Sequence, residues 1–170
     1  LEYLPERNKS ENIVYHTITT PVGGQYQLIL SDGTRAWINA ASSVRYPAAF
    51  SGDTRMVVVT GEVYFEVSHQ TAPSRKGKAG KYIPFEVDIA GKGKVEVLGT
   101  RFNINAYSGS DHITTTLVEG SIPYAPMLKN SSPALEKAYP NSGQIKLLPG
   151  QQVVMDEQGQ TEVVNDVDIE

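Results

Sequence analysis

LILSDGTRAWINAASSVRYPAAF, residues 28–50, is the stretch on which the interpretation of the whole chain rests. Two β-prone runs, LIL and RAWIN, flank Asp32-Gly33, and an Asp-Gly pair in this setting is the strongest short-range signal of a β-hairpin. A type I′ turn needs positive φ at both central residues, which Gly adopts freely and Asp tolerates. A two-residue turn here would place Leu28 opposite Trp37. The stretch therefore predicts strand pairing of defined register and no chemistry of its own.

The longest strand signal follows at residues 55–67, RMVVVTGEVYFEV. Successive side chains of a strand point to opposite faces, so this run presents one face that is almost wholly apolar. Gly61 interrupts that face, as a bulge, a tight bend or the close approach of another backbone would require. The predicted apolar face consists of Val57, Val59, Gly61, Val63, Phe65 and Val67.

A strand, a glycine and a second strand recur three times, in VTGEVYF, VEVLGTRFNINAY and TTTLVEGSIPY. Their glycines, Gly61, Gly99 and Gly120, suit strands that bend and pass from one sheet to another, as in sandwiches and rolls. No helical periodicity continues long enough to form a helix. The sequence therefore predicts an all-β fold with little helix, in which bent antiparallel strands stack as a twisted solenoid-like roll or a two-sheet sandwich.

The connections between strands are predicted from their turn-forming residues. Residues 68–82 are rich in Gly, Lys, Ser and Pro and are expected to form a mobile surface loop. Residues 125–143 are expected to form a second loop, with one short helical turn at 134–138. Near the C-terminal end, residues 145–155 surround Pro149-Gly150 and predict a closing hairpin.

Composition limits the class of protein. A chain of 170 residues is of single-domain size and can bury about 68–70% of the surface that its unfolded form exposes. The absence of cysteine removes disulfides, thiolate metal ligands and cysteine nucleophiles. The net charge is -4, and the basic cluster at 75–81 contains no aromatic residue, so no nucleic-acid partner is expected. No apolar run has the length of a membrane-spanning helix, and no signal peptide is present.

The residue types most often used in catalysis or metal binding do not form a recognisable site. His16, His69 and His112 are far apart in the chain, and no His-x-His spacing is present. Glu62 and Glu66 would lie about 13 Å apart on an extended strand, which is too far for the carboxylate pair of a glycosidase. No nucleophile elbow or phosphate-binding loop is present either. We therefore expect no catalytic residue, no metal site and no cofactor.

Six motifs, taken in chain order, resemble a known module. They are L-x-D-G-T-x-x-W-I-N-A-x-S-x-x-x-Y-P (30–47), R-x-V-x-V-x-G-E-V-Y-F-E-V (55–67), P-F-E-V (84–87), V-x-V-L-G-T-R-F-N-I-N-A-Y (95–107), T-T-L-V-E-G-S-I (115–122) and L-x-P-G-Q-Q (147–152). Each motif is weak alone, but the collinear set is specific. It resembles the FecR-type periplasmic domain of transmembrane anti-sigma factors, in the form abundant in Bacteroidetes.

The resemblance implies a regulatory protein that has no catalytic residues. FecR-type proteins hold an extracytoplasmic-function sigma factor through a small cytoplasmic domain, which a single membrane helix connects to the periplasmic part. The periplasmic part receives a signal from the N-terminal signalling domain of a TonB-dependent outer-membrane transporter. By this resemblance the chain would be the periplasmic part of a single-pass inner-membrane protein, and its partner-binding residues are unknown.

The same resemblance divides the chain into three segments. Residues 1–14 would be a linker from an upstream membrane helix, and residues 15–165 the FecR-type all-β periplasmic domain. Residues 166–170 would begin a linker to a small C-terminal domain that normally follows. Because the chain begins at Leu1 rather than Met, we expect it to be a piece of a longer protein.

We expect the motif residues to build the scaffold rather than to contact a ligand. The aromatic side chains predicted to supply core area are Trp37, Tyr64, Phe65, Phe102 and Tyr107. The asparagines predicted to satisfy strand ends or to form a short polar ladder are Asn39, Asn103 and Asn105. The alternative function is that of a carbohydrate-binding or cupin-like β domain, which needs a concave face with clustered aromatic side chains or a His/Glu metal triad.

Overall fold

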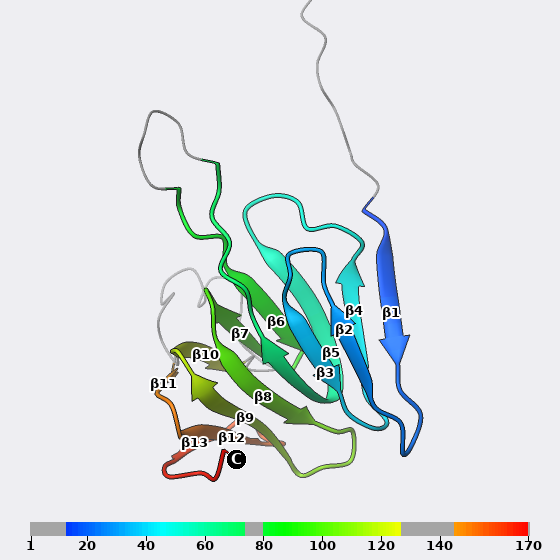
Figure 1. Cartoon of the computed structure of the whole chain (residues 1–170). Helices are drawn as coiled ribbons and strands as arrows, with labels where there is room; N and C mark the ends of the chain where they lie inside the picture. The colour runs from blue at the N-terminus through cyan, green and yellow to red at the C-terminus, as the bar shows by residue number, and fades with distance from the viewer. Residues whose placement is uncertain (1–12, 74–79, 127–144, 170) are drawn as a thin grey trace, which may run out of the picture.

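The computed structural model of the chain describes residues 13–73, 80–126 and 145–169. These residues form thirteen β-strands and no helix, which confirms the predicted all-β class. This part of the chain accordingly contains no helix that could cross a membrane. The strands form two sheets that enclose one hydrophobic core and share the long strand β5 (Figure 1).

Both sheets keep their strands in chain order. The first sheet contains, in spatial order, β1 (Tyr15–Thr19), β4 (Ser43–Pro47), the N-terminal half of β5 (Arg55–Glu66), β6 (Phe85–Ile89), β7 (Gly93–Val97), β10 (Ile122–Pro126) and β11 (Ile145–Leu147). The second contains β2 (Tyr26–Ile29), β3 (Arg35–Ile38), the C-terminal half of β5, β8 (Arg101–Ala106), β9 (His112–Glu119), β12 (Gln152–Asp156) and β13 (Thr161–Val164). The chain thus visits the two sheets alternately, as the predicted solenoid-like roll requires.

Strand β5 crosses from the first sheet to the second at Gly61. Its residues 55–60 pair with β4 and β6, and its residues 61–66 pair with β3 and β8. Gly61 has a φ of +76°, and a Cβ at this position would meet the Ser42 side chain at 2.3 Å. Glycine is therefore needed here both for the backbone conformation and for the close approach of Ser42.

Three further crossings between the sheets occur at glycines. Gly99 lies between β7 and β8, and Gly120 lies between β9 and β10, which confirms the predicted glycine corners. The third crossing, at Gly150, shows that the predicted closing hairpin is wrong, because β11 pairs with β10 whereas β12 pairs with β9 and β13. The Pro-Gly turn itself is present, with a hydrogen bond of 3.0 Å from Gln151 N to Leu148 O. A turn sets the local direction of the chain but does not select the strand with which the next run pairs.

The Asp-Gly hairpin forms with a register that differs by one residue from the prediction. Leu28 pairs with Ala36 rather than with Trp37. The loop contains the three residues 31–33, and only Gly33 among them has positive φ, at +84°. This is a type I turn followed by a left-handed residue, the usual form of a three-residue hairpin loop. Because side chains alternate with a period of two, the shift places Trp37 on the opposite face of the sheet from Leu28.

The centre of the core is a cluster of phenylalanines between the two sheets. The ring of Phe65 lies 5.8 Å from that of Phe85 in the first sheet and 5.4 Å from that of Phe102 in the second. All three side chains are fully buried, which confirms the core positions predicted for Phe65 and Phe102. The other predicted core aromatics are only partly buried, and they are Trp37, Tyr64 and Tyr107. Consecutive residues of a strand cannot share a face, so Tyr64 points away from the core that Phe65 enters.

The connection between β5 and β6 contains the predicted surface loop. These two strands are parallel, unlike every other pair of described strands, so the chain must return over the length of the sheet. The described part of the connection is a short antiparallel ladder, with a bridge between Thr71 and Tyr82. Residues 74–79 lie outside the described residues, as do residues 1–12 of the linker predicted at 1–14 and the helical turn predicted at 134–138.

Candidate functional site

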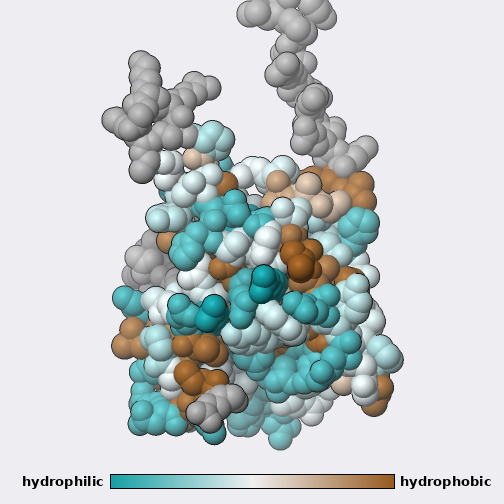
Figure 2. All heavy atoms as spheres, in the orientation of Figure 1, coloured by the Kyte–Doolittle hydropathy of each residue, from teal (hydrophilic) through white to brown (hydrophobic). Residues whose placement is uncertain are grey.

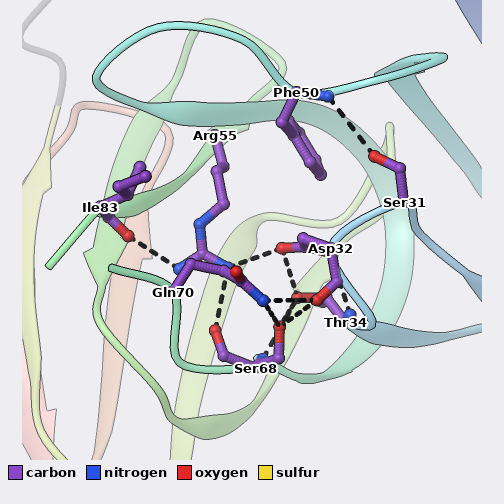
Figure 3. A network of polar contacts seen from close by, with 8 residues as sticks. All are labelled: Ser31, Asp32, Thr34, Phe50, Arg55, Ser68, Gln70 and Ile83. Carbon is purple, nitrogen blue, oxygen red and sulfur yellow. Dashed lines mark hydrogen bonds and ion pairs between the residues drawn. The ribbon is translucent and has the colours of Figure 1, made fainter. Parts of the chain in front are cut away.

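A buried ion pair joins the Asp-Gly hairpin to the first residue of β5. Nη1 of Arg55 lies 2.6 Å from Oδ2 of Asp32, and the two side chains are only 3% and 5% exposed (Figure 3). The Arg55 guanidinium also donates hydrogen bonds to the backbone carbonyls of Ser68, at 2.9 Å, and Ile83, at 2.8 Å. Buried charges are tolerated only when they are paired and hydrogen-bonded, and both conditions are met here.

The Asp32 residue is held by its other polar atoms as well. Its carboxylate accepts hydrogen bonds from N and Oγ1 of Thr34, at 2.9 and 2.8 Å. Its backbone carbonyl accepts from Oγ of Ser68, at 2.6 Å, and from Nε2 of Gln70, at 2.8 Å. This network fastens the hairpin turn to both ends of the connection between β5 and β6. The role of this network is structural, because the Asp32 carboxylate and the Arg55 guanidinium already form an ion pair with each other.

The sequence contains a signal for this network in the position of Arg55. Arg55 occupies the same alternating face of β5 as Val57 and Val59, and that face is buried. A charged side chain at a strand position that faces the buried side of the sheet needs a buried partner of opposite charge. Asp32, assigned only a turn-forming role from the sequence, is that partner.

The outer face of the second sheet carries a groove of about 410 Å³, called here the outer-face groove. The residues that line it come from β2, β3, β5 and β8 and the segments next to them, and they are Gln25, Tyr26, Gln27, Trp37, Ile38, Asn39, Glu62, Tyr64 and Asn103. Figure 2 shows one side of the molecule, on which hydrophilic residues cover most of the surface and hydrophobic ones form separate patches. The groove is lined by both aromatic and polar side chains.

The register of the sheet explains why these side chains meet. Gln27 pairs with Trp37, Trp37 with Tyr64, and Tyr64 with Asn103, so a single rung crosses four strands. The Trp37 and Tyr64 rings are 5.5 Å apart and inclined at 58°. The two-residue loop predicted from the sequence would place Trp37 on the inner face, so the sequence alone does not predict this rung. The three-residue loop brings both aromatic side chains into one outward-facing row.

A hydrogen-bonded group of amides and one carboxylate lies beside the aromatic rung. Glu62 accepts hydrogen bonds from Nδ2 of Asn39, at 2.6 Å, and from Nδ2 of Asn103, at 3.0 Å. Oδ1 of Asn39 accepts in turn from Nε2 of Gln25, at 3.0 Å. Asn39 and Asn103 therefore do belong to a polar ladder, centred on Glu62, and Asn105 lies opposite Glu62 in the strand register. These contacts hold the carboxylate in one orientation before any ligand binds.

A charged rung lies on the other side of the aromatic one. Glu66 lies 4.0 Å from Arg35 and 3.7 Å from Arg101, and Arg101 lies 2.9 Å from Glu119. Burial raises the pKa of Tyr64 above its usual 10.0, and the Glu66 carboxylate raises this pKa further, while Arg101 opposes the change. The Tyr64 phenol consequently keeps its proton, and with it the ability to donate a hydrogen bond, to a higher pH than an ordinary tyrosine does.

The other candidate residues from the sequence are not brought together. The three histidines belong to different elements, His16 to β1, His69 to the connection after β5 and His112 to β9. Glu62 and Glu66 have separate partners and do not form a carboxylate pair. Within the described residues, no group of three or more His, Cys, Asp or Glu side chains could hold a metal ion. Of the basic cluster at 75–81, residues 75–79 lie outside the described part of the chain.

The residues that line the outer-face groove are suited to recognition. Two aromatic rings offer apolar contact area, and amide and carboxylate groups offer donors and acceptors in fixed positions. Glu62, the one titratable carboxyl group among them, accepts hydrogen bonds from amides and has no nucleophile beside it in the groove. The arrangement can therefore bind a polar ligand, and it contains no nucleophile with an activating base.

Comparison with known proteins gives one family and one group of solved structures. The family model described as FecR protein matches residues 16–123. Two crystal structures of a candidate anti-sigma factor from Parabacteroides distasonis ATCC 8503 are similar to the chain, with TM-scores of 0.70 and 0.69 and sequence identities of 26% and 27%. The matches cover 91% and 89% of this chain but only 61% and 60% of those chains, so it spans about three fifths of their length. The comparison with curated proteins found no match.

Proposed function

Because the chain belongs to the FecR protein family, we propose that it is the periplasmic signal-receiving domain of an anti-sigma factor. In this proposal the domain senses the state of a TonB-dependent outer-membrane transporter by binding the N-terminal signalling domain of that transporter. The full-length protein passes the signal through a membrane helix and a cytoplasmic domain to an extracytoplasmic-function sigma factor. The main support is the match of the FecR family model to residues 16–123.

The structural likeness supports the regulatory part of this proposal. The domain is similar over 91% of its length to a structure of a candidate anti-sigma factor, at a TM-score of 0.70. A relay domain needs surfaces for a partner rather than a reaction centre, and the polar features of the described residues agree with that. Asp32 and Arg55 serve to fasten strands, and the groove is suited to binding. We therefore propose a binding module and not an enzyme.

The edge formed by β1 and β2 is the surface we propose for the partner. In the described part of the chain, β1 pairs only with β4 and β2 only with β3, so each leaves one side of its backbone unpaired. Half of the exposed large hydrophobic side chains of the described residues lie on or next to these strands, and they are Ile13, Val14, Tyr15, Val22, Tyr26 and Ile29. An apolar, unpaired edge is the usual site at which a partner strand is added to a sheet.

Titration of the complete periplasmic region with transporter signalling domains tests the function. The signalling domains of the TonB-dependent transporters encoded near the gene are the probes, and isothermal titration calorimetry measures their affinity. We expect one of them to bind with a dissociation constant of about 1–10 μM. Absence of binding by every such domain at about 100 μM would contradict the relay function.

Two lysine substitutions at opposite edges of the second sheet test the proposed surface. Ile29 on β2 is 64% exposed and Val164 on β13 is 38% exposed, so neither change disturbs the core. Ile29→Lys is expected to weaken binding of the signalling domain about tenfold, because the added charge must be desolvated when a strand pairs there. Val164→Lys is the matched control and should leave affinity unchanged. The reverse result would move the partner to the β13 edge while leaving the relay function intact.

A further inference from the structure

We propose that the outer-face groove is a binding site for a neutral saccharide. A sugar ring would stack on Trp37 and Tyr64, and its hydroxyl groups would bond to Glu62 and the two asparagines that hold it. This proposal does not rest on the proposed relay function, because it concerns the face of the second sheet; the two surfaces meet at β2, where Tyr26 lies in both. It makes the domain a receptor for a small ligand as well as for a protein.

Trp37 and Tyr64 supply the apolar half of the site. They are cross-strand neighbours with ring centroids 5.5 Å apart, and both keep part of their surface exposed. Outward-facing positions on the solvated side of a sheet are ordinarily polar, so two adjacent aromatic side chains there are unusual for a scaffold role alone. The C–H face of a sugar ring is flat and apolar, and it can cover an aromatic ring while the hydroxyl groups at its rim remain free.

The carboxylate of Glu62 supplies the polar half together with its amide partners. Its two oxygens accept one hydrogen bond each from Asn39 and Asn103, at 2.6 and 3.0 Å. An ionised carboxylate can accept about four hydrogen bonds, and each asparagine amide has two N–H groups, so donors and acceptors remain available. A vicinal pair of hydroxyl groups both donates and accepts, which matches this combination. The fixed geometry of the network lowers the entropy lost on binding.

The charge of the groove favours an uncharged ligand. Glu62 is the one charged side chain among the lining residues, and no lysine or arginine lines the groove. The nearest cations in the adjacent rung, Arg35 and Arg101, are already paired with Glu66. An anionic ligand would be repelled by Glu62 without a compensating cation, whereas a hydroxyl group can donate to it in a charge-assisted hydrogen bond.

The position and size of the groove favour a saccharide over a peptide strand. Trp37 lies on β3 and Tyr64 on β5, and both strands are paired on either side, so no free backbone groups are available beneath the rings. A peptide added as a strand needs such groups, whereas a sugar is recognised by side chains alone. The volume of about 410 Å³ lies within the range of about 300–1,000 Å³ that small-ligand sites occupy.

The sole tryptophan of the chain makes the test direct, because Trp37 lies in the groove and every change in tryptophan emission reports on it. The whole chain is titrated with cellotriose, maltotriose, xylotriose and chitotriose, and with trigalacturonic acid as the anionic comparison. We expect a saturable change in emission with at least one neutral trisaccharide, at a dissociation constant of about 1 mM or tighter. The anionic trisaccharide is expected to bind about tenfold more weakly or not at all.

Two variants separate a built site from non-specific contact. Glu62→Gln keeps the size of the side chain but removes its charge, and is expected to weaken binding about tenfold. Gln27→Ala removes an exposed neighbour of Trp37 on β2, and is expected to weaken binding about threefold without unfolding the domain. Glu96→Gln, an exposed acid on β7 of the first sheet, is the matched control and should bind like the parent chain.

Three results would overturn the proposal. The first is an unchanged emission with every neutral trisaccharide at about 50 mM, well above the expected dissociation constant. The second is equal affinity in the parent chain and in both groove variants. The third is a response to the transporter signalling domain but to no saccharide, which would show that the groove is a protein contact.

Discussion

The carboxylate of Asp32, in a hairpin turn of the second sheet, forms a 2.6 Å ion pair with the guanidinium of Arg55, at the start of the strand that both sheets share. The two residues are 23 positions apart in the chain, and both charges are buried, with the Asp32 and Arg55 side chains 5% and 3% exposed. The most recognisable turn of the sequence is thereby attached to the centre of the fold. Loss of either partner would leave a buried charge without its counter-ion.

Asp32→Ala is therefore expected to lower the free energy of unfolding by about 3–5 kcal/mol, because Arg55 would remain buried without a counter-ion. Urea denaturation followed by circular dichroism measures the change. Glu66→Ala is the matched control, since it breaks the more exposed contacts with Arg35 and Arg101 and should cost less than about 1 kcal/mol. Equal losses for the two variants would contradict the structural role of the buried pair.

Gly61→Ala should be among the most damaging single-methyl additions in the domain. The alanine would hold a φ of +76° and place its Cβ 2.3 Å from the Ser42 side chain, so we expect a loss of at least about 3 kcal/mol. Gly52→Ala provides the comparison, because Gly52 has a φ of +87° with no atom near the added Cβ, and should cost about 1–2 kcal/mol. Thermal denaturation of the two variants separates the clash from the backbone strain. Similar melting temperatures for the two variants would show that the Ser42 side chain moves aside and relieves the clash.

The observed register of the hairpin predicts unequal effects of removing two aromatic rings. Phe65→Ala should lower stability by about 3–5 kcal/mol, since the ring is fully buried between the sheets. Trp37→Ala removes a larger ring from the outer face and should cost only about 1–2 kcal/mol. If chemical denaturation gave the two variants equal losses, Trp37 would have to face the core, as the two-residue loop implied.

The raised pKa of Tyr64 predicts a specific loss of stability in alkali. Because the folded state holds the phenolic proton more tightly than the unfolded state, this stabilising contribution is fully present below pH 10.0 and is lost as the pH rises through the folded pKa. Tyr64→Phe abolishes the ionisation, so its free energy of unfolding should decline less steeply above this pH. Urea denaturation as a function of pH measures both slopes. Tyr82→Phe, at a 51% exposed position, controls for the loss of a hydroxyl group.

The sequence predicted the fold class, and the positions at which the chain crosses between the sheets, better than it predicted which strands pair. Alternation along residues 55–67 identified the buried face of β5, and three glycines marked where the chain changes sheets. These features are local, and local sterics decide them. The partner of a strand depends on the whole chain, which is why the turn at Pro149-Gly150 predicts a hairpin that does not form.

The candidate site was harder to predict because it depends on register. The sequence predicts that Asn39 and Asn103 satisfy strand ends or form a short polar ladder, but their common position beside Glu62 follows only from the pairing of β3, β5 and β8. One extra residue in the hairpin loop, Ser31, moved Trp37 from the expected core to the groove. A single-residue slip in a strand changes the face of every side chain on it, so an error of this size reverses the functional interpretation.

Because both sheets share β5, different parts of the domain should expose their backbone amides to solvent at different rates. Neighbouring strands flank β5 on both sides, first β4 and β6 and then β3 and β8, so its amides reach solvent only when both sheets separate together. In native-state hydrogen exchange the amides of residues 57–65 should exchange most slowly, at the rate of global unfolding. Those of β1 and β13 should exchange much faster, by local fraying. The edge strands β1 and β13 can therefore open and rearrange around a partner many times before the domain unfolds once.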